Sequence, residues 1–456
     1  MGNMDVNSIF FISLGCDKNL VDSEFMLGVL QEHGFLITDD ETEADAIIVN
    51  TCCFINDAKE ESIHTILTMA EHKKTGRCKI LLVTGCLAQR YQHEIRQEIP
   101  EVDAVLGIGA QKELVHALRE AAKGTAYESF SASDGLPRHN TEDQSAAHPK
   151  RVVTTGGHYA YLKIAEGCDK HCTYCVIPSV RGSYRSIPLE ELLRQAEQLA
   201  QSGVKELILV AQETTRYGMD LYGEKSLYRL LDRLSQIEGL SWIRILYCYP
   251  EEIDDPLIEA IRRNKKVCHY LDMPIQHAND EILRRMGRKT CRQDIQNIVE
   301  KLRREIPDIC LRTTVICGFP GETQAQHEEL MDFINEMEFD RLGAFTYSPE
   351  EGTAAAEFPD QIDEEVKINW QEEVMELEQE IIFEKTAGMK GQVICAFIEG
   401  KLPDENVYVA RAYRDAPDVD GYVFVSGADT ELLTGEFVKA RVTGSLDYDL
   451  MAEYLP

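Results

Sequence analysis

Three cysteines are spaced closely enough to share one metal centre. Cys168, Cys172 and Cys175 form a CxxxCxxC segment directly after the apolar run at 161–167. Three thiolates on one short loop can bind three irons of a 4Fe-4S cluster and leave the fourth iron without a protein ligand. A zinc loop with His171 as fourth ligand is the alternative, but zinc sites more often use paired CxxC units. The position just after a predicted strand favours the cluster.

This segment resembles the radical SAM superfamily, whose open iron binds S-adenosylmethionine (SAM). The resemblance implies that Tyr174, the aromatic residue before the last cysteine, contacts the adenine of SAM. It also implies that Glu213, after the predicted strand 206–210, binds the SAM amino group. The two glycines usual in that motif are Ala211 and Gln212 here. Without the resemblance, a glutamate at this place is as often a helix cap or a solvated side chain.

A glycine-containing turn follows the fifth predicted strand of this region, in the segment TTVICGFPGET at 313–323. Glycine lets the backbone approach a ligand closely. We therefore expect Gly318 to contact SAM. The alternative is an ordinary strand-to-helix turn, because glycine and proline are common in such turns.

A second set of cysteines is spread over the first 86 residues. Cys16, Cys52 and Cys86 each follow a predicted strand, in FFISLGC, AIIVNTC and ILLVTGC. In a parallel sheet all three would lie at the same carboxyl edge, where three thiolates would again leave one iron open. Cys53 could substitute for Cys52, although its side chain should point the other way if the strand continues. Strand-end cysteines are also often buried and neutral.

The remaining cysteines stand singly in apolar or helical surroundings without ligand spacing. We interpret them as small buried apolar side chains. They are Cys78, Cys248, Cys268, Cys291, Cys310, Cys317 and Cys395.

The pattern of apolar runs predicts an α/β protein in three parts. Residues 1–125 alternate strands (8–14, 46–49, 79–84) with helices (22–33, 57–72, 110–122), which indicates a parallel sheet. A polar segment, 126–153, is predicted to be an exposed linker. Six further strand–helix units in 154–385 (strands 160–164, 206–210, 242–247, 269–273, 311–316 and 343–347) predict a partial (β/α)6 barrel. The acidic helix 364–385 should lead to a small antiparallel β-barrel at 387–456.

The chain resembles the methylthiotransferase family over nearly its full length. The matching pieces are SLGCDKNLVDSE, VNTCCFINDAKEESI, TGCLAQRY, EGCDKHCTYCVIP and the terminal β segment. The resemblance implies an N-terminal domain with three cysteines, a radical SAM core and a C-terminal TRAM barrel. It also implies two 4Fe-4S clusters and two SAM molecules, one cleaved to a radical that removes hydrogen from carbon and one that methylates the inserted sulfur.

Composition sets limits on location and partners. The chain has 456 residues, a net charge of −32 and no apolar run long enough to span a membrane. Its N-terminus lacks the basic flank of a signal peptide, so we expect a cytoplasmic protein and no membrane partner. In a reducing compartment, fourteen cysteines indicate metal binding rather than disulfides. An acidic chain repels nucleic acid and attracts basic partners.

Two branches of the resembled family differ in substrate. The motif SLGCDKNLVDSE resembles the branch that modifies an aspartate β-carbon of ribosomal protein S-twelve, whereas the tRNA branch typically has Gln-Met-Asn after the cysteine. Residues 384–456 hold seven Lys or Arg and thirteen Asp or Glu, a balance of −6. This favours a basic protein substrate over tRNA. We also expect an electron donor such as flavodoxin or ferredoxin. The alternatives are a tRNA methylthiotransferase and a non-catalytic iron–sulfur protein that docks on ribosomes.

Overall fold

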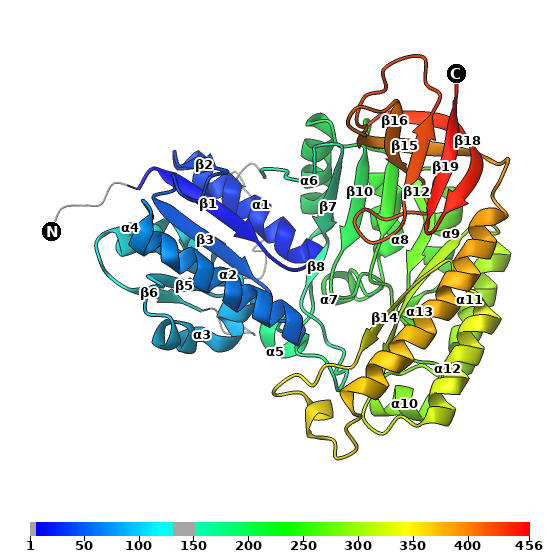
Figure 1. Cartoon of the computed structure of the whole chain (residues 1–456), viewed down its shortest axis with the longest axis horizontal. Helices are drawn as coiled ribbons and strands as arrows, with labels where there is room; N and C mark the ends of the chain where they lie inside the picture. Colours follow the sequence, from blue (N-terminus) through cyan, green and yellow to red (C-terminus); the bar gives the residue numbers. More distant parts are fainter. Residues whose placement is uncertain (1–5, 131–150) are drawn as a thin grey trace.

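Two parallel sheets and a small closed barrel follow one another along the chain (Figure 1). The computed structural model describes residues 6–130 and 151–456. The N-terminal sheet lies at the left of Figure 1, the second sheet at the centre and right, and the small barrel at the upper right. None of the helices in these ranges is long and apolar enough to cross a membrane. The predicted α/β class and its three-part order are confirmed.

The N-terminal sheet has six parallel strands in the order β2-β1-β3-β4-β5-β6. Helices α2 and α3 pack with Ile47 and Val49 on one face, and α1 and α4 pack with Ile48 on the other. Both faces are therefore covered, which is why β3 and β4 are buried throughout. The elements are β1 (Ser8–Ser13), α1 (Asp17–Glu32), β2 (Leu36–Thr38), β3 (Ala46–Thr51), α2 (Asn56–Thr75), β4 (Ile80–Gly85), α3 (Cys86–Glu98), β5 (Ala104–Leu106), η1 (Ala110–Glu113), α4 (Leu114–Ala122) and β6 (Tyr127–Ser129).

Two boundaries in this domain differ from the prediction. Helix α1 begins at Asp17, immediately after Cys16, rather than at residue 22. Strand β6 lies inside the predicted linker 126–153 and pairs with β5, so the linker cannot begin at 126. A three-residue edge strand is too short to show an alternating pattern. The stretch 131–150 of that linker lies outside the described residues.

The second sheet is the predicted partial barrel. Its six parallel strands run in the order β14-β13-β12-β11-β10-β7, and the two edge strands do not pair with each other. The strands are β7 (Tyr159–Lys163), β10 (Glu206–Val210), β11 (Trp242–Ile245), β12 (Val267–Asp272), β13 (Cys310–Cys317) and β14 (Arg341–Thr346). The longer helices are α6 (Leu189–Gln201), α8 (Leu227–Leu234), α9 (Asp255–Arg263), α11 (Arg292–Glu305), α12 (Gln324–Met337) and α13 (Glu364–Ala387). Short elements between them are β8 (Ala165–Glu166), α5 (Ile177–Arg181), β9 (Arg185–Ser186), α7 (Met219–Tyr222), η2 (Pro250–Glu252), α10 (Asp280–Arg285) and η3 (Ala354–Glu357).

The inner face of the partial barrel is covered by segments from both other domains. One core cluster joins inward side chains of the strands, such as Tyr161 and Tyr270, to Val21 of α1 and to Ala416 of the C-terminal domain. The N-terminal domain and the C-terminal barrel are thus both packed against the same central sheet. This packing places α1, which begins beside Cys16, against the barrel.

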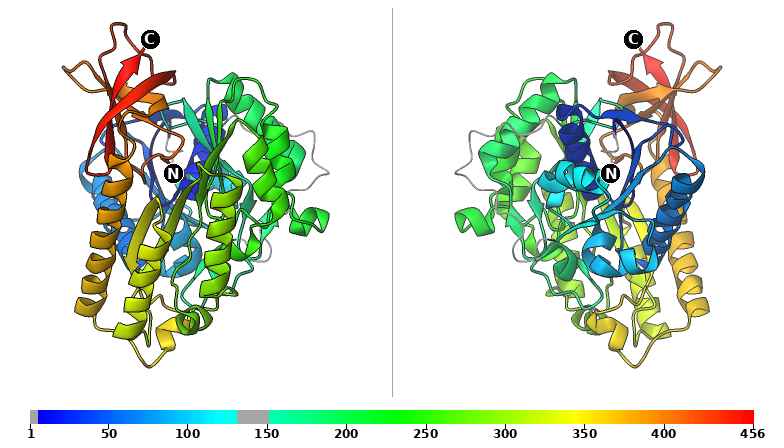
Figure 2. Two further views of the ribbon diagram at one scale, coloured as in Figure 1. Left: turned by 90° about the vertical axis from the view of Figure 1, so that its right-hand side faces the viewer. Right: turned by 90° about the vertical axis from the view of Figure 1, so that its left-hand side faces the viewer.

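Helix α13 leads from the barrel to the C-terminal domain, as Figure 2 shows. Five strands close there in the order β15-β16-β17-β19-β18, which confirms the predicted small barrel. One of its pairs, β17 with β19, is parallel, so the barrel is not wholly antiparallel. The strands are β15 (Val393–Lys401), β16 (Val407–Arg411), β17 (Val423–Ser426), β18 (Phe437–Leu446) and β19 (Asp449–Leu455).

Candidate active site

The CxxxCxxC loop leaves the carboxyl end of β7 and is held by its own backbone. The Cys168 amide donates to the Gly182 oxygen over 3.1 Å, and the Cys175 amide donates to the Cys172 oxygen over 3.1 Å. Gly167 has a φ of +78°, and a Cβ there would lie 2.5 Å from the Gly182 oxygen. Only glycine allows this close approach. The loop is therefore fixed on both sides of its first cysteine.

The thiols of this loop are shielded from water. Cys168 and Cys172 are buried, and Cys175 is partly buried. Burial raises the pKa of Cys168 to about 12 and also raises that of Cys175. Such thiols ionise when a cation binds them, because the metal charge replaces the lost hydration. This environment suits thiolate ligands of a bound metal centre rather than free nucleophiles.

Aromatic side chains surround Cys172. The Tyr249 hydroxyl lies 4.0 Å from the Cys172 sulfur, and the Arg288 guanidinium lies 4.3 Å from the centre of the Tyr249 ring. Burial raises the pKa of Tyr174 well above its ordinary value, and a charge on Cys172 raises it further. Tyr174 is therefore buried close to Cys172, and its contact with the adenine of SAM stays a prediction. Tyr249 and Arg288 are far from the loop in sequence, and no local pattern singled them out.

Glu213 follows β10 as a buried carboxylate without a hydrogen-bond partner. Its exposed fraction is 0%, and neither oxygen accepts a hydrogen bond from the described residues. The nearest cation is Lys170 of the cysteine loop, whose Nζ lies 3.7 Å from Oε1. Burial raises the pKa of Glu213 to about 7, against the opposing charge of Lys170. A buried carboxylate with free acceptor positions fits a ligand that brings its own ammonium group.

Gly318 at the end of β13 has a packing reason to be glycine. Its φ is +75°, and a Cβ there would lie 2.3 Å from the Cγ of Lys367 on α13. Its amide donates to Glu322 over 2.8 Å. Helix α13 thus fills the space that the missing side chain leaves. The expected contact between Gly318 and SAM stays a prediction.

The second cysteine set lies at the carboxyl ends of three neighbouring strands. Cys16 caps the start of α1 after β1, Cys52 follows β3, and Cys86 begins α3 after β4. A Cβ on Gly15 would lie 2.7 Å from the Cys52 sulfur, so the two loops are in direct contact. Burial raises the pKa of Cys86, and charges on Cys16 and Cys52 raise it further. The strand order thus gathers the three thiols at one edge.

Cys53 also lies close to this set. Its charge raises the pKa of Cys86 more than the charges of Cys16 and Cys52 do. Burial raises the pKa of Cys53 itself to about 11. Cys53 packs into the core beside α2 and α3, and Cys52 is not part of that core cluster. The prediction that the two adjacent side chains point apart assumed that the strand continues, but β3 ends at Thr51, so it stays a prediction.

Charged side chains connect the two cysteine sets across the domain boundary. Lys163 of β7 pairs with Asp22 of α1 and with Glu166, the latter over 2.7 Å. Arg181 pairs with Glu166 over 2.9 Å and donates to the Cys86 sulfur over 3.2 Å. No local pattern indicated the contacts with Asp22 and Cys86, because these two residues are distant in sequence from Lys163 and Arg181.

The zinc alternative requires several side chains that can bind one metal ion together. In residues 6–130 and 151–456, no three His, Cys, Asp or Glu side chains are arranged to hold one metal ion. A zinc site needs such a group, whereas a cluster binds each thiolate at a different iron. His171, the possible fourth zinc ligand, is exposed. Cys291 and Cys395 were interpreted as buried, but Cys291 is partly exposed and Cys395 is exposed, which corrects that interpretation.

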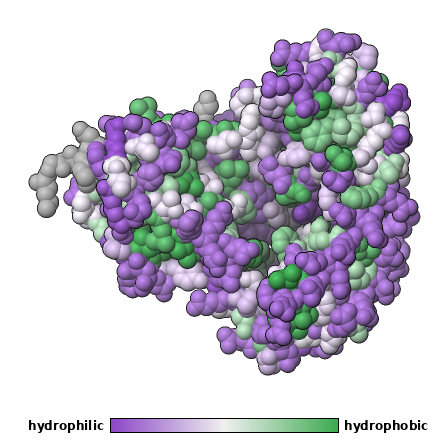
Figure 3. Space-filling view, in the orientation of Figure 1, coloured by the Kyte–Doolittle hydropathy of each residue, from purple (hydrophilic) through white to green (hydrophobic). Residues whose placement is uncertain are grey.

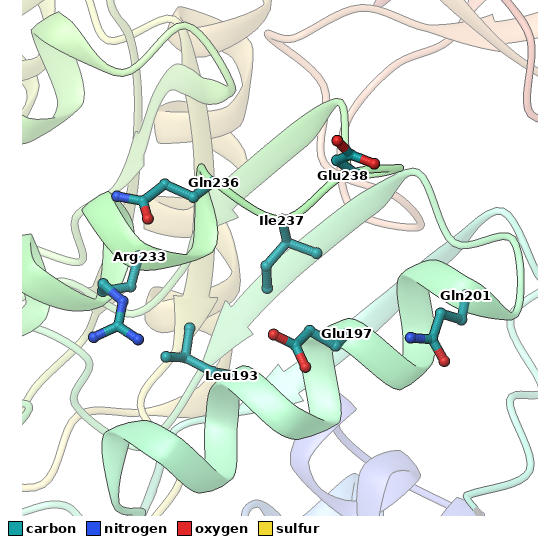
Figure 4. A pocket seen from close by; sticks show the side chains of 7 residues that line it. All are labelled: Leu193, Glu197, Gln201, Arg233, Gln236, Ile237 and Glu238. Atoms are coloured by element: carbon teal, nitrogen blue, oxygen red, sulfur yellow. The ribbon is translucent and has the colours of Figure 1, made fainter.

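The surface has a hollow between the domains and a separate pocket beside α6. Figure 3 shows a hollow, lined mainly by hydrophilic residues, between the N-terminal domain and the two other domains. A pocket of about 390 Å³ lies elsewhere, between α6 and the loop after α8 (Figure 4). Its polar lining includes Glu197, Arg233 and Gln236. None of the six predicted ligand cysteines lines this pocket, so it takes no part in the site.

Family comparisons agree with the three-part organisation. Residues 8–107 match the family described as "Uncharacterized protein family UPF0004", residues 162–334 match the radical SAM superfamily, and residues 391–455 match the TRAM domain. Among solved structures, two of the radical SAM methyltransferase TsrM from Kitasatospora setae are similar in fold. The structure with cobalamin and a [4Fe-4S] cluster bound has a TM-score of 0.55 and 14% identity, and covers 77% of this chain and 74% of that one. The structure with tryptophan and aza-SAM bound has a TM-score of 0.53 and 15% identity, with coverages of 74% and 72%.

Relatives of much higher identity cover nearly the whole chain. "Ribosomal protein uS12 methylthiotransferase RimO" of Lachnoclostridium phytofermentans is 56% identical over 443 residues, 97% of this chain and 99% of the relative. The protein of the same name from Pelotomaculum thermopropionicum is 49% identical, with 98% of each chain covered. That of Clostridioides difficile is 47% identical, with coverages of 97% and 98%.

The fold and the cysteine loop define the class: this is a radical SAM enzyme with an N-terminal UPF0004 domain and a C-terminal TRAM domain. Within that class the chain belongs to the RimO family of methylthiotransferases. Membership implies SAM and a 4Fe-4S cluster. The shielded thiols of the CxxxCxxC loop and the Glu213 carboxylate, which accepts no hydrogen bond from the described residues, fit that pair of cofactors.

Proposed function

We propose that this chain inserts a methylthio group at the β-carbon of an aspartate in ribosomal protein uS12, using two 4Fe-4S clusters and two SAM molecules. The observation that carries the proposal is the presence of two sets of three cysteines, each at the carboxyl edge of a parallel sheet, with Arg181 of the barrel donating to Cys86 of the N-terminal set. Each set would leave one iron open. The RimO names of relatives 47–56% identical support the substrate.

At the first site, Cys168, Cys172 and Cys175 would hold the cluster and leave its open iron for SAM. Tyr174 would contact the adenine, and Glu213 would accept hydrogen bonds from the SAM amino group. Gly318 is proposed to let the backbone approach SAM. Together, cluster and SAM supply the one-electron chemistry that removes a hydrogen atom from an unreactive carbon. The chain's own task is to orient these groups and exclude water.

At the second site, Cys16, Cys52 and Cys86 would hold the auxiliary cluster, which supplies the methylthio group. Cys16 and Cys86 lie at the amino ends of α1 and α3. The partial positive charge of a helix amino end stabilises thiolates, which are the form that binds iron. The donor set and its helix positions therefore fit a cluster.

Charge supports a protein substrate. The terminal domain is acidic, and a barrel that binds tRNA should be basic. A tRNA methylthiotransferase is therefore the second candidate rather than the first. A non-catalytic docking protein would not need an open iron or a buried Glu213 carboxylate that accepts no hydrogen bond from the described residues. The electron donor is proposed to be flavodoxin or ferredoxin, and the location the cytoplasm.

The test is to incubate anaerobically reconstituted protein with SAM, a reductant and uS12 within small ribosomal subunits. Mass spectrometry should find one methylthio group on an aspartate of uS12. Cys172→Ala should abolish both this product and the cleavage of SAM to 5′-deoxyadenosine. A methylthiolated adenosine in tRNA, with unmodified uS12, would favour the second candidate instead.

Cys52 and its neighbour offer a matched pair of variants. Cys52→Ala should retain SAM cleavage but form no methylthiolated product, because it removes a ligand of the auxiliary cluster. Cys53→Ala should retain both activities. If the effects were reversed, Cys53 rather than Cys52 would be the ligand.

A further inference from the structure

Arg181 is a buried side chain that lies close after the CxxxCxxC loop in sequence and contacts Cys86 of the N-terminal set. It lies on α5, six residues after Cys175, and its exposed fraction is 3%. Its Nη2 lies 3.2 Å from the Cys86 sulfur and 3.2 Å from Oδ1 of Asn19, which is on α1. Its Nη1 lies 2.9 Å from Oε1 of Glu166. One guanidinium thus reaches a thiol of the N-terminal domain while it stays bound to the barrel.

Glu166 fixes Arg181 relative to the CxxxCxxC loop. It lies two residues before Cys168 and also accepts from Gln212, over 3.0 Å, and from Lys163, over 2.7 Å. Gln212 immediately precedes Glu213. A chain of hydrogen bonds therefore runs from Gln212, the residue before Glu213, through Glu166 to Arg181 and on to Cys86.

We infer that Arg181 is a positioning residue for the second cluster: it donates to the Cys86 thiolate and ties that site to the radical SAM loop. This inference rests on the auxiliary cluster of the proposed function. A guanidinium is planar, always charged and able to donate to several acceptors at once, which a lysine or glutamine in its place cannot reproduce. Because Arg181 belongs to the barrel, its donation couples the placement of the two sites.

A donated hydrogen bond and a positive charge should also affect the electronic properties of the cluster. Reduction adds negative charge, so a cation beside a thiolate ligand stabilises the reduced form and raises the reduction potential. Loss of Arg181 should lower the potential of the auxiliary cluster. A purely structural role at the domain boundary would leave the potential unchanged.

The experiment uses the full chain with Cys168→Ala, Cys172→Ala and Cys175→Ala, so that only the auxiliary cluster can assemble. Arg181→Gln and Arg181→Lys are compared in this background. The matched control is Arg151→Gln, because Arg151 forms another buried contact between the domains, with Glu24 over 2.6 Å. Among the described residues, Arg151 bonds to no thiol. Iron content and a redox titration followed by electron paramagnetic resonance are measured.

We expect a lower potential for Arg181→Gln, a smaller shift for Arg181→Lys and none for Arg151→Gln. Loss of iron from the Arg181 variants but not from Arg151→Gln would also support the inference. The control also removes a buried contact between the domains, so a general weakening of that boundary would affect it too. Equal potentials in all variants, or equal loss of iron from all, would overturn it. If the background protein itself bound no iron, the proposed auxiliary cluster would fail first, which separates the two proposals.

Discussion

Glu213 is the residue whose environment says most about a ligand. A carboxylate that is fully buried, with neither oxygen hydrogen-bonded, is costly unless something else satisfies it. Burial raises its pKa to about 7, so it is largely neutral below that pH and charged above it. Only the charged form pairs with an ammonium group. The affinity for SAM should therefore rise between pH 6 and pH 8.

We expect Glu213→Gln to weaken SAM binding at pH 8 by about 10- to 100-fold, the usual worth of a hydrogen bond to a charged group. The same variant should lose the pH dependence. Equilibrium binding of SAM to the reconstituted protein measures both. Glu252→Gln is the control, because Glu252 also pairs with Lys170, over 2.6 Å, but its oxygens are satisfied by lysines. Unchanged binding by Glu213→Gln would remove this residue from the site.

Some residues of the site can be predicted from the local sequence, and others can be recognised only from their contacts in the fold. Cys168, Cys172 and Cys175 could be predicted because their spacing is a property of one short loop. Arg288 and Arg181 could not, because each acts through contacts with residues far along the chain. An arginine in sequence carries no sign of its partner until the fold brings the two together.

Among the elements, strand β16 is joined to the barrel by a buried ion network. Arg411 at its end pairs with Glu206 of β10 and with Glu399, each over 2.6 Å. Arg244 of β11 pairs with the same Glu206 over 2.8 Å. Burial would raise the pKa of Glu206, but the two arginines outweigh it and hold the pKa below its ordinary value. The stability from this network is present at neutral pH and falls on acidification through that lowered pKa.

Arg411→Ala should destabilise the protein by about 3–5 kcal/mol, because it breaks two buried ion pairs and leaves Arg244 as the one arginine that still pairs with Glu206. Chemical denaturation of the full chain measures this as a lower midpoint. The control is Arg262→Ala, whose side chain is exposed and pairs with Glu259 on the same helix over 2.9 Å. That change should cost under about 1 kcal/mol. Similar midpoints for the two variants would argue against a tightly fastened C-terminal barrel.

Elements were predictable in proportion to their length and burial. The barrel strands stand out as apolar runs, and β10 was predicted with its observed bounds, 206–210. The short strands β2, β5 and β6 were missed, since three residues carry no periodicity. Helix α3 was missed because its sequence, CLAQRYQHEIRQE, is mostly polar. The packing of α1 and of the segment around Ala416 inside the barrel depends on contacts between domains, which no local pattern encodes.

At the scale of the whole molecule, the acidity of the C-terminal domain is a surface property. Three of its charged side chains form ion pairs with the partial barrel and are therefore not available to a partner: Arg411, Asp415 and Asp420. From residue 390 onward, eight acids and four bases are exposed: Asp404, Glu405, Asp418, Asp429, Glu431, Glu436, Asp447 and Glu453, against Lys390, Lys401, Lys439 and Arg441. The surface that a partner would meet is therefore negative, in a chain whose net charge is −32.

Such a surface should attract a basic ribosomal protein over distance and repel tRNA. Attraction between exposed charges is screened beyond about 10 Å at 0.1 M salt and beyond about 3 Å at 1 M. The association rate with purified uS12 should therefore fall by about tenfold or more between 0.05 and 0.5 M salt, while the dissociation rate changes less. Stopped-flow or surface-based kinetics can separate the two rates. Added tRNA should not compete for uS12 binding to the enzyme's acidic surface. An association rate that does not depend on salt would contradict the charge argument. Displacement of uS12 by tRNA that binds the enzyme directly would also contradict it and would favour tRNA as the substrate.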